Sequence, residues 1–172
     1  MHSDAPVRVG VLGVQTTAPP AVDLSLAASI VTDFLAGQLS QPWEPVSQTL
    51  STPSQTQVEE HLIRYVDQAG YLLIFTLGGI GPTAADVIPD AIRAVCPKPF
   101  PGFGERIRQL VRSVDPAALL LRPLAGIRQQ TLVVGLPAEP TTLRACLPAL
   151  FPAIPNAVFL ASGQRIGFRP AQ

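Results

Sequence analysis

The feature that most constrains this chain is a cluster of glycines directly after an apolar run. Residues 71–75, Tyr-Leu-Leu-Ile-Phe, have the composition of a buried strand. The segment TLGGIGPTAADVIPDA follows over residues 76–91, with Gly78, Gly79 and Gly81 close together. Glycines after a strand let backbone N–H groups approach an anionic ligand without a side chain in the way. The segment therefore predicts a strand–loop–helix site for a phosphorylated ligand.

Two acidic residues, Asp86 and Asp90, follow the glycines at a spacing of one helical turn. A helix that begins near Asp86 would direct its positive N-terminal end toward the same ligand. A carboxylate in that place is suited to hold a metal ion or to orient a nucleophile. The alternative is that both acids only cap the helix and favour its dipole, by about 0.3–1 kcal/mol each.

Alternating hydrophobic patterns predict an α/β chain. The expected strands cover residues 7–14, 44–50, 71–75 and 131–136. The expected helices cover residues 26–35, 58–69, 86–95, 105–114 and 141–150, and a short last element covers residues 156–161. Thr141 is the expected cap of the helix at 141–150. Strands that alternate with helices of about 10–15 residues favour a three-layer α/β/α fold, with a mostly parallel sheet and helices on both faces.

The order of the elements also predicts where a ligand binds. In sheets of this kind ligands lie beyond the carboxyl ends of the strands. The loop after Phe75 and the loop over residues 137–140 both follow such ends, so we expect them to line one crevice. A length of 172 residues suits a single domain. Its core is expected over about residues 6–162, followed by a loose tail over residues 163–172.

Charge and cysteine content argue against several classes of protein. Twelve lysines and arginines balance twelve acidic residues, which gives no basic footprint for nucleic acid or an anionic membrane. With 47% hydrophobic and 14% charged residues, the chain favours self-association, so we expect a homo-oligomer. No apolar run reaches the roughly 18 residues of a membrane span, and no signal peptide is evident. Cys96 and Cys146 are expected to be buried and unpaired, and His61 lies outside any zinc-binding cluster. A cytoplasmic protein is the simplest interpretation.

Five segments, in order along nearly the whole chain, resemble the molybdopterin adenylyltransferase family of molybdenum cofactor biosynthesis. They are residues 76–91, PGFGE at 101–105, Arg122 with AGIR at 125–128, LPAEP at 136–140 and FPAIP at 151–155. The resemblance implies a molybdopterin-binding α/β/α domain that forms a homotrimer or hexamer. It also implies an enzyme that uses Mg²⁺ and ATP to transfer AMP to the terminal phosphate of molybdopterin, with release of pyrophosphate.

The resemblance also assigns roles to residues. Asp86 is the expected catalytic residue and Mg²⁺ ligand, since a hard cation prefers carboxylate oxygens. Asp90 and Glu105 are expected as further ligands or orienting groups, although Glu105 alternatively caps its helix or pairs with an arginine one turn later. Arg122 and Arg128 are either surface or subunit-contact charges or phosphate-binding groups. The remaining expected substrate-binding residues lie in the two loops: Thr76, Gly78, Gly79, Ile80, Gly81, Pro137, Ala138 and Glu139.

The chain departs from the family pattern at several of these places. The family carries an acidic residue after the second strand, where this chain has no carboxylate over residues 50–55 and Ser54 is the closest substitute. Ile80 replaces a loop threonine, and Ala138 and Glu139 replace Gly and Ser or Asn. A carboxylate at Glu139 would repel a phosphate about 4 Å away by roughly 1–4 kcal/mol.

These departures leave two alternatives to the enzyme. One is a non-catalytic or weakly active paralogue that binds molybdopterin or a related pterin. The other is an oligomeric structural domain that has lost its ligand. A second carboxylate beside Asp86, such as Glu139 or Glu105, would restore a plausible metal site and favour the enzyme.

Overall fold

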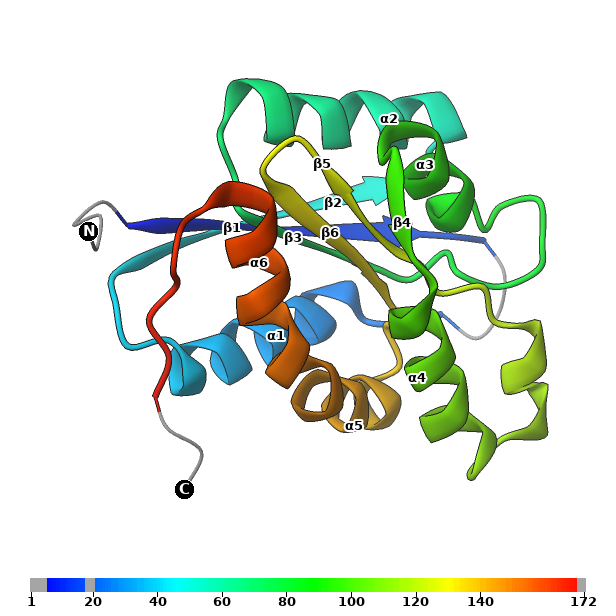
Figure 1. Cartoon of the computed structure of the whole chain (residues 1–172). Coiled ribbons are helices and arrows are strands. Elements are labelled where there is room, and N and C mark those ends of the chain that lie inside the picture. Colours follow the sequence, from blue (N-terminus) through cyan, green and yellow to red (C-terminus); the bar gives the residue numbers. More distant parts are fainter. Residues whose placement is uncertain (1–5, 18–20, 170–172) are drawn as a thin grey trace.

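The computed structural model describes residues 6–17 and 21–169 (Figure 1). The elements follow the chain in the order β1 (Val7–Gln15), α1 (Leu24–Gln38), β2 (Trp43–Ser51), α2 (Gln55–Ile63), η1 (Arg64–Gln68), β3 (Leu73–Leu77), α3 (Ile88–Val95), β4 (Lys98–Phe100), α4 (Pro101–Arg112), η2 (Pro116–Leu120), β5 (Ala125–Arg128), β6 (Thr131–Leu136), α5 (Pro140–Leu150), η3 (Phe151–Ala153) and α6 (Ile154–Ser162). The short element η1 is a π-helical turn, and η2 and η3 are 3-10 turns.

One six-stranded sheet organises the fold, with the strand order β2-β1-β3-β6-β5-β4. The strands β2, β1, β3 and β6 run parallel, whereas β5 and β4 run antiparallel to their neighbours. Helices α1, α4, α5 and α6 cover one face of the sheet, and α2 and α3 cover the other (Figure 1). The structure thus confirms the predicted α/β/α fold with a mostly parallel sheet.

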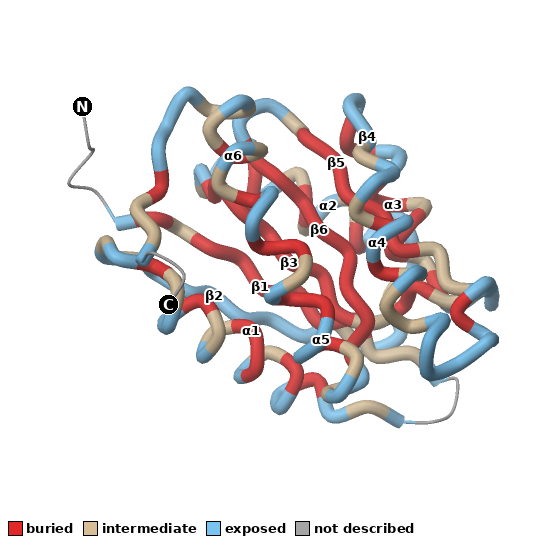
Figure 2. The backbone as a smooth tube through the Cα atoms, turned by 60° about the horizontal axis from the view of Figure 1, so that its bottom comes forward, coloured by how far each residue is buried: buried red, intermediate tan, exposed pale blue. Residues whose placement is uncertain are grey.

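The core consists of two hydrophobic clusters, one on each face of the sheet. The central strand β3 is buried along its whole length and feeds both clusters. Leu73, Phe75 and Leu77 point into the cluster under α1 and α5, while Ile74 points into the cluster under α2 and α3. Figure 2 shows that burial is concentrated in the central strands, whereas the edge strand β2 is largely exposed.

The helices begin within a few residues of the expected positions, and two of the differences concern expected site residues. The helix expected from Asp86 begins at Ile88, because Asp86 belongs to a turn that precedes the helix and Pro89 occupies the first turn of α3. The helix expected from Glu105 begins at Pro101, again with proline in the first turn. Two glycines in the segment PGFGE lowered its apparent helix propensity and hid this start.

The sequence analysis missed two strands, β4 and β5. Strand β4 has only three residues and contains Pro99, which is tolerated because β4 lies at the edge of the sheet. Strand β5 has four residues, Ala125–Arg128, and forms a hairpin with β6. Both strands are too short to display the alternation by which strands are found in sequence.

The expectation of a loose tail fails for the described residues after 163. Phe168 forms a β-bridge with Leu39, and its ring packs edge-on against Phe151 with centroids 5.0 Å apart. The backbone of Gly167 accepts a hydrogen bond from Ser40 N–H at 3.0 Å. The tail therefore docks on the end of α1 through apolar and backbone contacts. Residues 170–172 lie outside the described part of the chain.

One helical stretch, residues 140–162, is long and apolar enough to cross a membrane by length and composition alone, with a mean hydropathy of 1.6. The sequence analysis did not expect this stretch, because α5, η3 and α6 are divided by prolines and by Arg144. Its apolar side chains Leu143, Leu147 and Val158 are buried in the cluster against the sheet. A core helix of a globular domain passes the same test, so the stretch is weak evidence for a membrane span.

Candidate functional site

The main cleft has a volume of about 760 Å³ and lies where the carboxyl ends of β1, β3 and β6 meet. The loop after β3 and the loop after β6 both line it, as expected from the sequence. The other wall comes from α4 and the segment that leads into η2. The lining residues are Val14, Gln15, Thr16, Val22, Leu24, Gly78, Gly79, Ile80, Gly81, Pro82, Thr83, Asp86, Leu110, Val111, Val114, Asp115, Leu121, Pro137, Ala138, Glu139, Thr141, Thr142 and Ala145.

The glycine loop after β3 presents its backbone to this cleft. Gly78 and Gly79 have φ angles of +83° and +59°, which side chains other than glycine rarely adopt. Gly78 N–H donates to Leu136 O at 3.1 Å and so ties the two loops together. Within the described part of the chain, the N–H groups of Gly79, Ile80 and Gly81 donate no hydrogen bond. They are the donors that the loop offers to a ligand.

Asp86 is buried at the floor of the loop, with 8% of its surface exposed. Its Oδ2 accepts hydrogen bonds from Thr83 N–H at 2.9 Å and from Thr83 Oγ1 at 2.6 Å. A Cβ at Gly81 would lie only 2.7 Å from the same oxygen, so any larger residue there would displace the carboxylate. Among the described residues Oδ1 makes no hydrogen bond, and it is left to bind a ligand.

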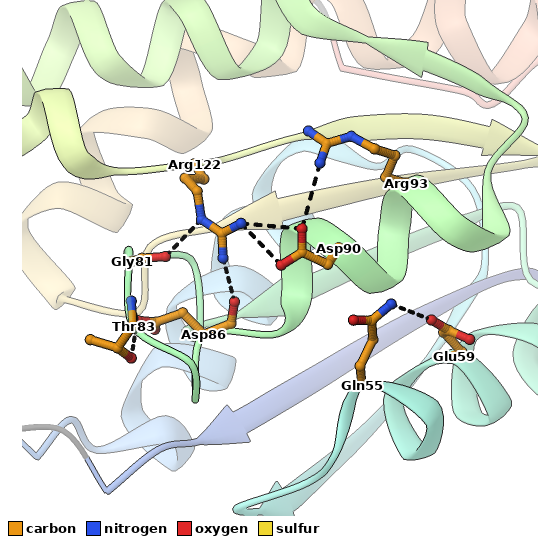
Figure 3. Close-up of polar contacts among 8 residues, drawn as sticks. All are labelled: Gln55, Glu59, Gly81, Thr83, Asp86, Asp90, Arg93 and Arg122. Atoms are coloured by element: carbon orange, nitrogen blue, oxygen red, sulfur yellow. Dashed lines mark hydrogen bonds and ion pairs between the residues drawn. The ribbon is translucent and has the colours of Figure 1, made fainter.

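Asp90 does not reach the cleft lining, because an ion pair holds it. Arg122 Nη1 contacts Asp90 Oδ2 at 3.0 Å and Oδ1 at 3.2 Å, and Arg93 approaches the same carboxylate at 3.5 Å (Figure 3). Both oxygens of Asp90 are thus occupied by arginine. The expected role of Asp90 as a ligand stays a prediction, and its observed role is to anchor Arg122 to α3.

Arg122 donates hydrogen bonds to backbone carbonyl groups of the glycine loop and of Asp86. Its Nε donates to Gly81 O at 2.9 Å, and its Nη2 donates to Asp86 O at 2.7 Å (Figure 3). Its backbone N–H donates to Ile80 O at 2.8 Å. Because guanidinium hydrogen bonds are directional and charge-assisted, this set fixes the backbone around Asp86. The sequence analysis offered a surface charge, a subunit contact or phosphate binding for Arg122, and it did not indicate these contacts with the glycine loop.

The loop after β6 uses its acidic residue differently. Glu139 is the N-cap of α5: Oε1 accepts from Thr141 N–H at 3.0 Å, and Oε2 accepts from Thr142 N–H at 2.7 Å and Thr142 Oγ1 at 2.6 Å. These hydrogen bonds, first those of Thr142, lower the pKa of Glu139 to about 2. Thr141 is therefore not the cap that the sequence suggested. The helix begins one residue earlier, at Pro140, which lacks an N–H and suits a first turn.

Several expected site residues lie away from the cleft lining. Glu105 is exposed on α4, and Ser54 forms a capping box with Gln57 at the start of α2. Thr76 is fully buried, and its hydroxyl has no hydrogen-bond partner in the described structure. Arg128 forms an ion pair with Asp67 at 2.7 Å. Neither Ser54 nor Glu105 joins Asp86 in this structure.

The two cysteines are buried and unpaired, as predicted. Desolvation by burial raises the pKa of the Cys96 thiol to about 12 and that of Cys146 to about 11. Thiols held in the neutral form are poor nucleophiles. Both cysteines are therefore packing residues.

The charged side chains among the described lining residues of the cleft are all acidic. Three carboxylates line it, from Asp86, Asp115 and Glu139, and no lysine or arginine appears among its described lining residues. Asp115, like Glu139, accepts a backbone N–H, from Ala117 at 2.8 Å. Among the described lining residues, an anionic ligand would therefore meet only uncharged donors unless a cation accompanied it.

The chemistry of these donors fits Mg²⁺ that arrives with a phosphorylated ligand. Mg²⁺ is commonly bound by one or two carboxylates together with substrate phosphates and water. Asp86 supplies one such carboxylate. In the described part of the chain no three His, Cys, Asp or Glu side chains gather into a ready-made metal cage.

An apolar wall, which the sequence analysis missed, faces the glycine loop across the cleft. It consists of Leu110 and Val111 from α4, Val114, and Leu121 after η2. Val114 is 84% exposed. A signal was present in the sequence for three of them, because Leu110, Val111 and Val114 follow Ile107 at helical spacing around the end of α4. Such a wall suits a flat, weakly polar ring.

Comparison with known proteins places this cleft in a family context. Residues 30–156 match a family described as a probable molybdopterin binding domain. The chain is 34% identical over 174 residues to the molybdopterin adenylyltransferase of Helicobacter pylori strain J99, an alignment that covers 96% of this chain and 98% of that protein. It is 32% identical over 152 residues to the Escherichia coli K12 enzyme of the same name, covering 88% and 77%. Among solved structures, the molybdopterin biosynthesis enzyme MoaB from Thermus thermophilus superposes with a TM-score of 0.77 at 29% identity, covering 92% of this chain and 98% of that one.

Proposed function

We propose that this chain, which belongs to the molybdopterin adenylyltransferase family, transfers AMP from ATP to the terminal phosphate of molybdopterin. In this reaction a phosphate oxygen of molybdopterin attacks the α-phosphorus of ATP. The bond from that phosphorus to the oxygen bridging to the β-phosphate breaks as the new phosphoanhydride bond forms. Pyrophosphate leaves with the electron pair of the broken bond.

The observation that carries the proposal is the glycine loop with its neighbouring acid. Three N–H groups, from residues 79–81, have no partner among the residues that the structure describes, and their loop packs against the buried carboxylate of Asp86 at the carboxyl end of β3. Transfer of a phosphoryl-type group depends mainly on alignment and on neutralisation of charge. Fixed backbone donors supply both for phosphate oxygens, and Arg122 holds them in place through the carbonyls of the loop.

Asp86 is the residue that would hold Mg²⁺, through the oxygen that Thr83 does not occupy. When bound, Mg²⁺ neutralises phosphate charge and withdraws electron density from the phosphorus. This contribution matters more here than in a basic cleft, because no lysine or arginine is among the described lining residues. The apolar wall at Leu110 and Val111 is the proposed contact for the adenine or pterin ring.

The enzyme is favoured over the non-catalytic paralogue. The relatives that match at 30–34% identity over 88–96% of this chain carry the enzyme's name. The changes at Ser54 and Glu139 do not remove Asp86 or the free N–H groups of the glycine loop. We therefore propose that the changes at these two positions alter the properties of the site without removing its activity.

We also propose that the protein is a cytoplasmic homotrimer or hexamer. A second groove, of about 540 Å³, lies on the surface formed by the start of α4, the end of α5 and α6. Its lining is mostly apolar, and Leu160 at its edge is 73% exposed. An apolar groove of this kind supports contact with a second copy. Free, buried cysteines support a reducing compartment. Light scattering coupled to size-exclusion chromatography tests the oligomer, and a monomer would contradict it.

The decisive experiment follows adenylylated product from molybdopterin, ATP and Mg²⁺, with the wild type and Asp86→Asn. The asparagine keeps an oxygen for Thr83 but loses the charge, so we expect the rate to fall by about 100-fold or more. Asp115→Asn is the matched control, since Asp115 also lines the cleft but caps η2. Its rate should stay within about threefold of wild type, because Asp115 is exposed and its charge is screened by solvent. Unchanged turnover in Asp86→Asn would refute the proposed site.

A further inference from the structure

In the described structure, the first turn of α5 has no backbone N–H left for a ligand. A helix normally begins with several N–H groups that lack partners. In α5 the first residue is Pro140, which has no N–H. Thr141 and Thr142 donate to the Glu139 carboxylate at 3.0 and 2.7 Å, and Leu143 N–H donates to Glu139 O at 2.9 Å. One residue, Glu139, therefore saturates the whole end of the helix.

The glycine loop across the same cleft differs from the start of α5, because its backbone donors remain available to a ligand. Its N–H groups at residues 79–81 have no partner among the described residues, and its acid, Asp86, leaves one oxygen unbonded. The two loops are tied together by the hydrogen bond from Gly78 to Leu136, so they share one cleft. Of these two loops as described, only the glycine loop has unpaired backbone N–H groups for an anion.

We propose that Glu139 is a specificity-determining residue that confines the anionic group of the ligand to the glycine loop and keeps it away from α5. Its carboxylate blocks the donors of Thr141 and Thr142 and adds a negative charge at the opposite rim. Phosphate groups would then bind at the glycine loop and would be disfavoured at α5. This inference rests on the proposed function only for the class of ligand, a phosphorylated compound.

The test maps the binding of inorganic phosphate by two-dimensional amide NMR, in the wild type and in Glu139→Ser. In the wild type, phosphate should shift the amides of residues 79–81 and leave those of Thr141 and Thr142 unmoved. In Glu139→Ser, the amides of Thr141 and Thr142 should also respond. The phosphate affinity should rise about fivefold, as expected when a like charge about 4 Å away is removed in water.

Glu139→Gln is a second variant, which removes the charge but keeps the size and a capping oxygen. Its affinity should lie between the other two. Glu60→Gln is the matched control, because Glu60 is an exposed acid on α2 that does not line the cleft. Phosphate binding by this control should equal that of wild type. Amide shifts outside α5 report whether each variant is folded.

Two outcomes would overturn the inference. One is a phosphate-induced shift of Thr141 and Thr142 in the wild type, which would mean that Glu139 yields to the ligand. The other is a phosphate affinity within twofold of wild type in both Glu139 variants. A wild type that binds no phosphate while Glu139→Ser binds it at α5 would contradict the role of the glycine loop in the proposed function and still support the role of Glu139.

Discussion

The loops after β3 and β6 contain the same kinds of residues, but in the described structure only the loop after β3 leaves backbone N–H groups available to a ligand. Each has an acidic residue that accepts hydrogen bonds from the N–H and hydroxyl of a threonine three positions away. Asp86 bonds back to Thr83, which precedes it, and closes a turn before α3. Glu139 bonds forward to Thr142 and closes the start of α5. The direction of the bond decides whether the loop's donors remain open to a ligand or are satisfied within the chain.

The comparison shows that an acidic residue near a helix start is not by itself evidence of a binding site. At the glycine loop the carboxylate shapes a turn, and the backbone donors are separate from it. At the β6 loop the carboxylate and the donors satisfy each other. Three substitutions, from the largest expected effect on the free energy of unfolding to the smallest, test how each loop is held.

Arg122→Ala should have the largest effect, because it removes the guanidinium from two loop carbonyls and from Asp90. Both partners of the ion pair are about a third exposed, so we expect a loss of about 2–3 kcal/mol, less than for a buried pair. Urea denaturation measures it. The control is Arg93→Ala, whose side chain is 67% exposed and approaches Asp90 only at 3.5 Å. This control should lose less than about 0.5 kcal/mol, and equal losses would argue against the clamp.

Gly81→Ala should have an intermediate effect. Its Cβ would lie 2.7 Å from Asp86 Oδ2, so the carboxylate must move, at a cost of about 1–3 kcal/mol. Adenylyl transfer should fall in parallel, since Asp86 is displaced. Gly102→Ala on α4 is the control, because its Cβ would meet nothing within 4 Å. Replacing glycine in a helix there should raise stability by about 0.4–1 kcal/mol. A Gly81→Ala protein with unchanged stability and turnover would break the proposed link between the turn and Asp86.

Glu139→Gln should have the smallest effect, about 0.5–1 kcal/mol, since the amide oxygen still caps α5 but without charge. The difference from wild type depends on pH with a defined sign. The pKa of Glu139 is lowered from 4.5 to about 2 on folding, so its stabilising effect is fully present above about pH 4.5 and disappears as the pH falls to 2. Thermal melts between pH 2 and 7 check this. A difference that does not change with pH would exclude the charged cap.

The fold and the location of the site were predictable from the sequence, because both depend on local patterns. The apolar strand before Gly78 and the β-branched run before Pro137 identify two neighbouring parallel strands, and the rule that ligands bind at carboxyl ends then places the cleft. The short strands β4 and β5 were not predictable. They owe their pairing to tertiary contacts, since neither is long enough to show a period.

The details of the site depend on contacts between residues far apart in the sequence or on competition between caps. Arg122 contacts residues 32 to 41 positions away, and no local pattern shows where its guanidinium points. Thr141 is a better cap than Glu139 by residue preference alone. Pro140 moves the helix start one residue earlier and thereby gives the cap to Glu139. The three-residue spacing between Glu139 and Thr142 was the available signal.

The anion-binding groups of the glycine loop belong to the main chain, and this has a consequence for genetics. Replacing any one side chain of residues 79–81 leaves the three N–H groups in place, so a scan of single alanine substitutions would report strain or displacement rather than the loss of a contact. Among single substitutions only proline would delete a donor, so selection at Gly79 and Gly81 acts on backbone conformation and on the position of Asp86. An amide-to-ester replacement at one of these three positions, made by chemical ligation, would remove a single donor and read its contribution directly.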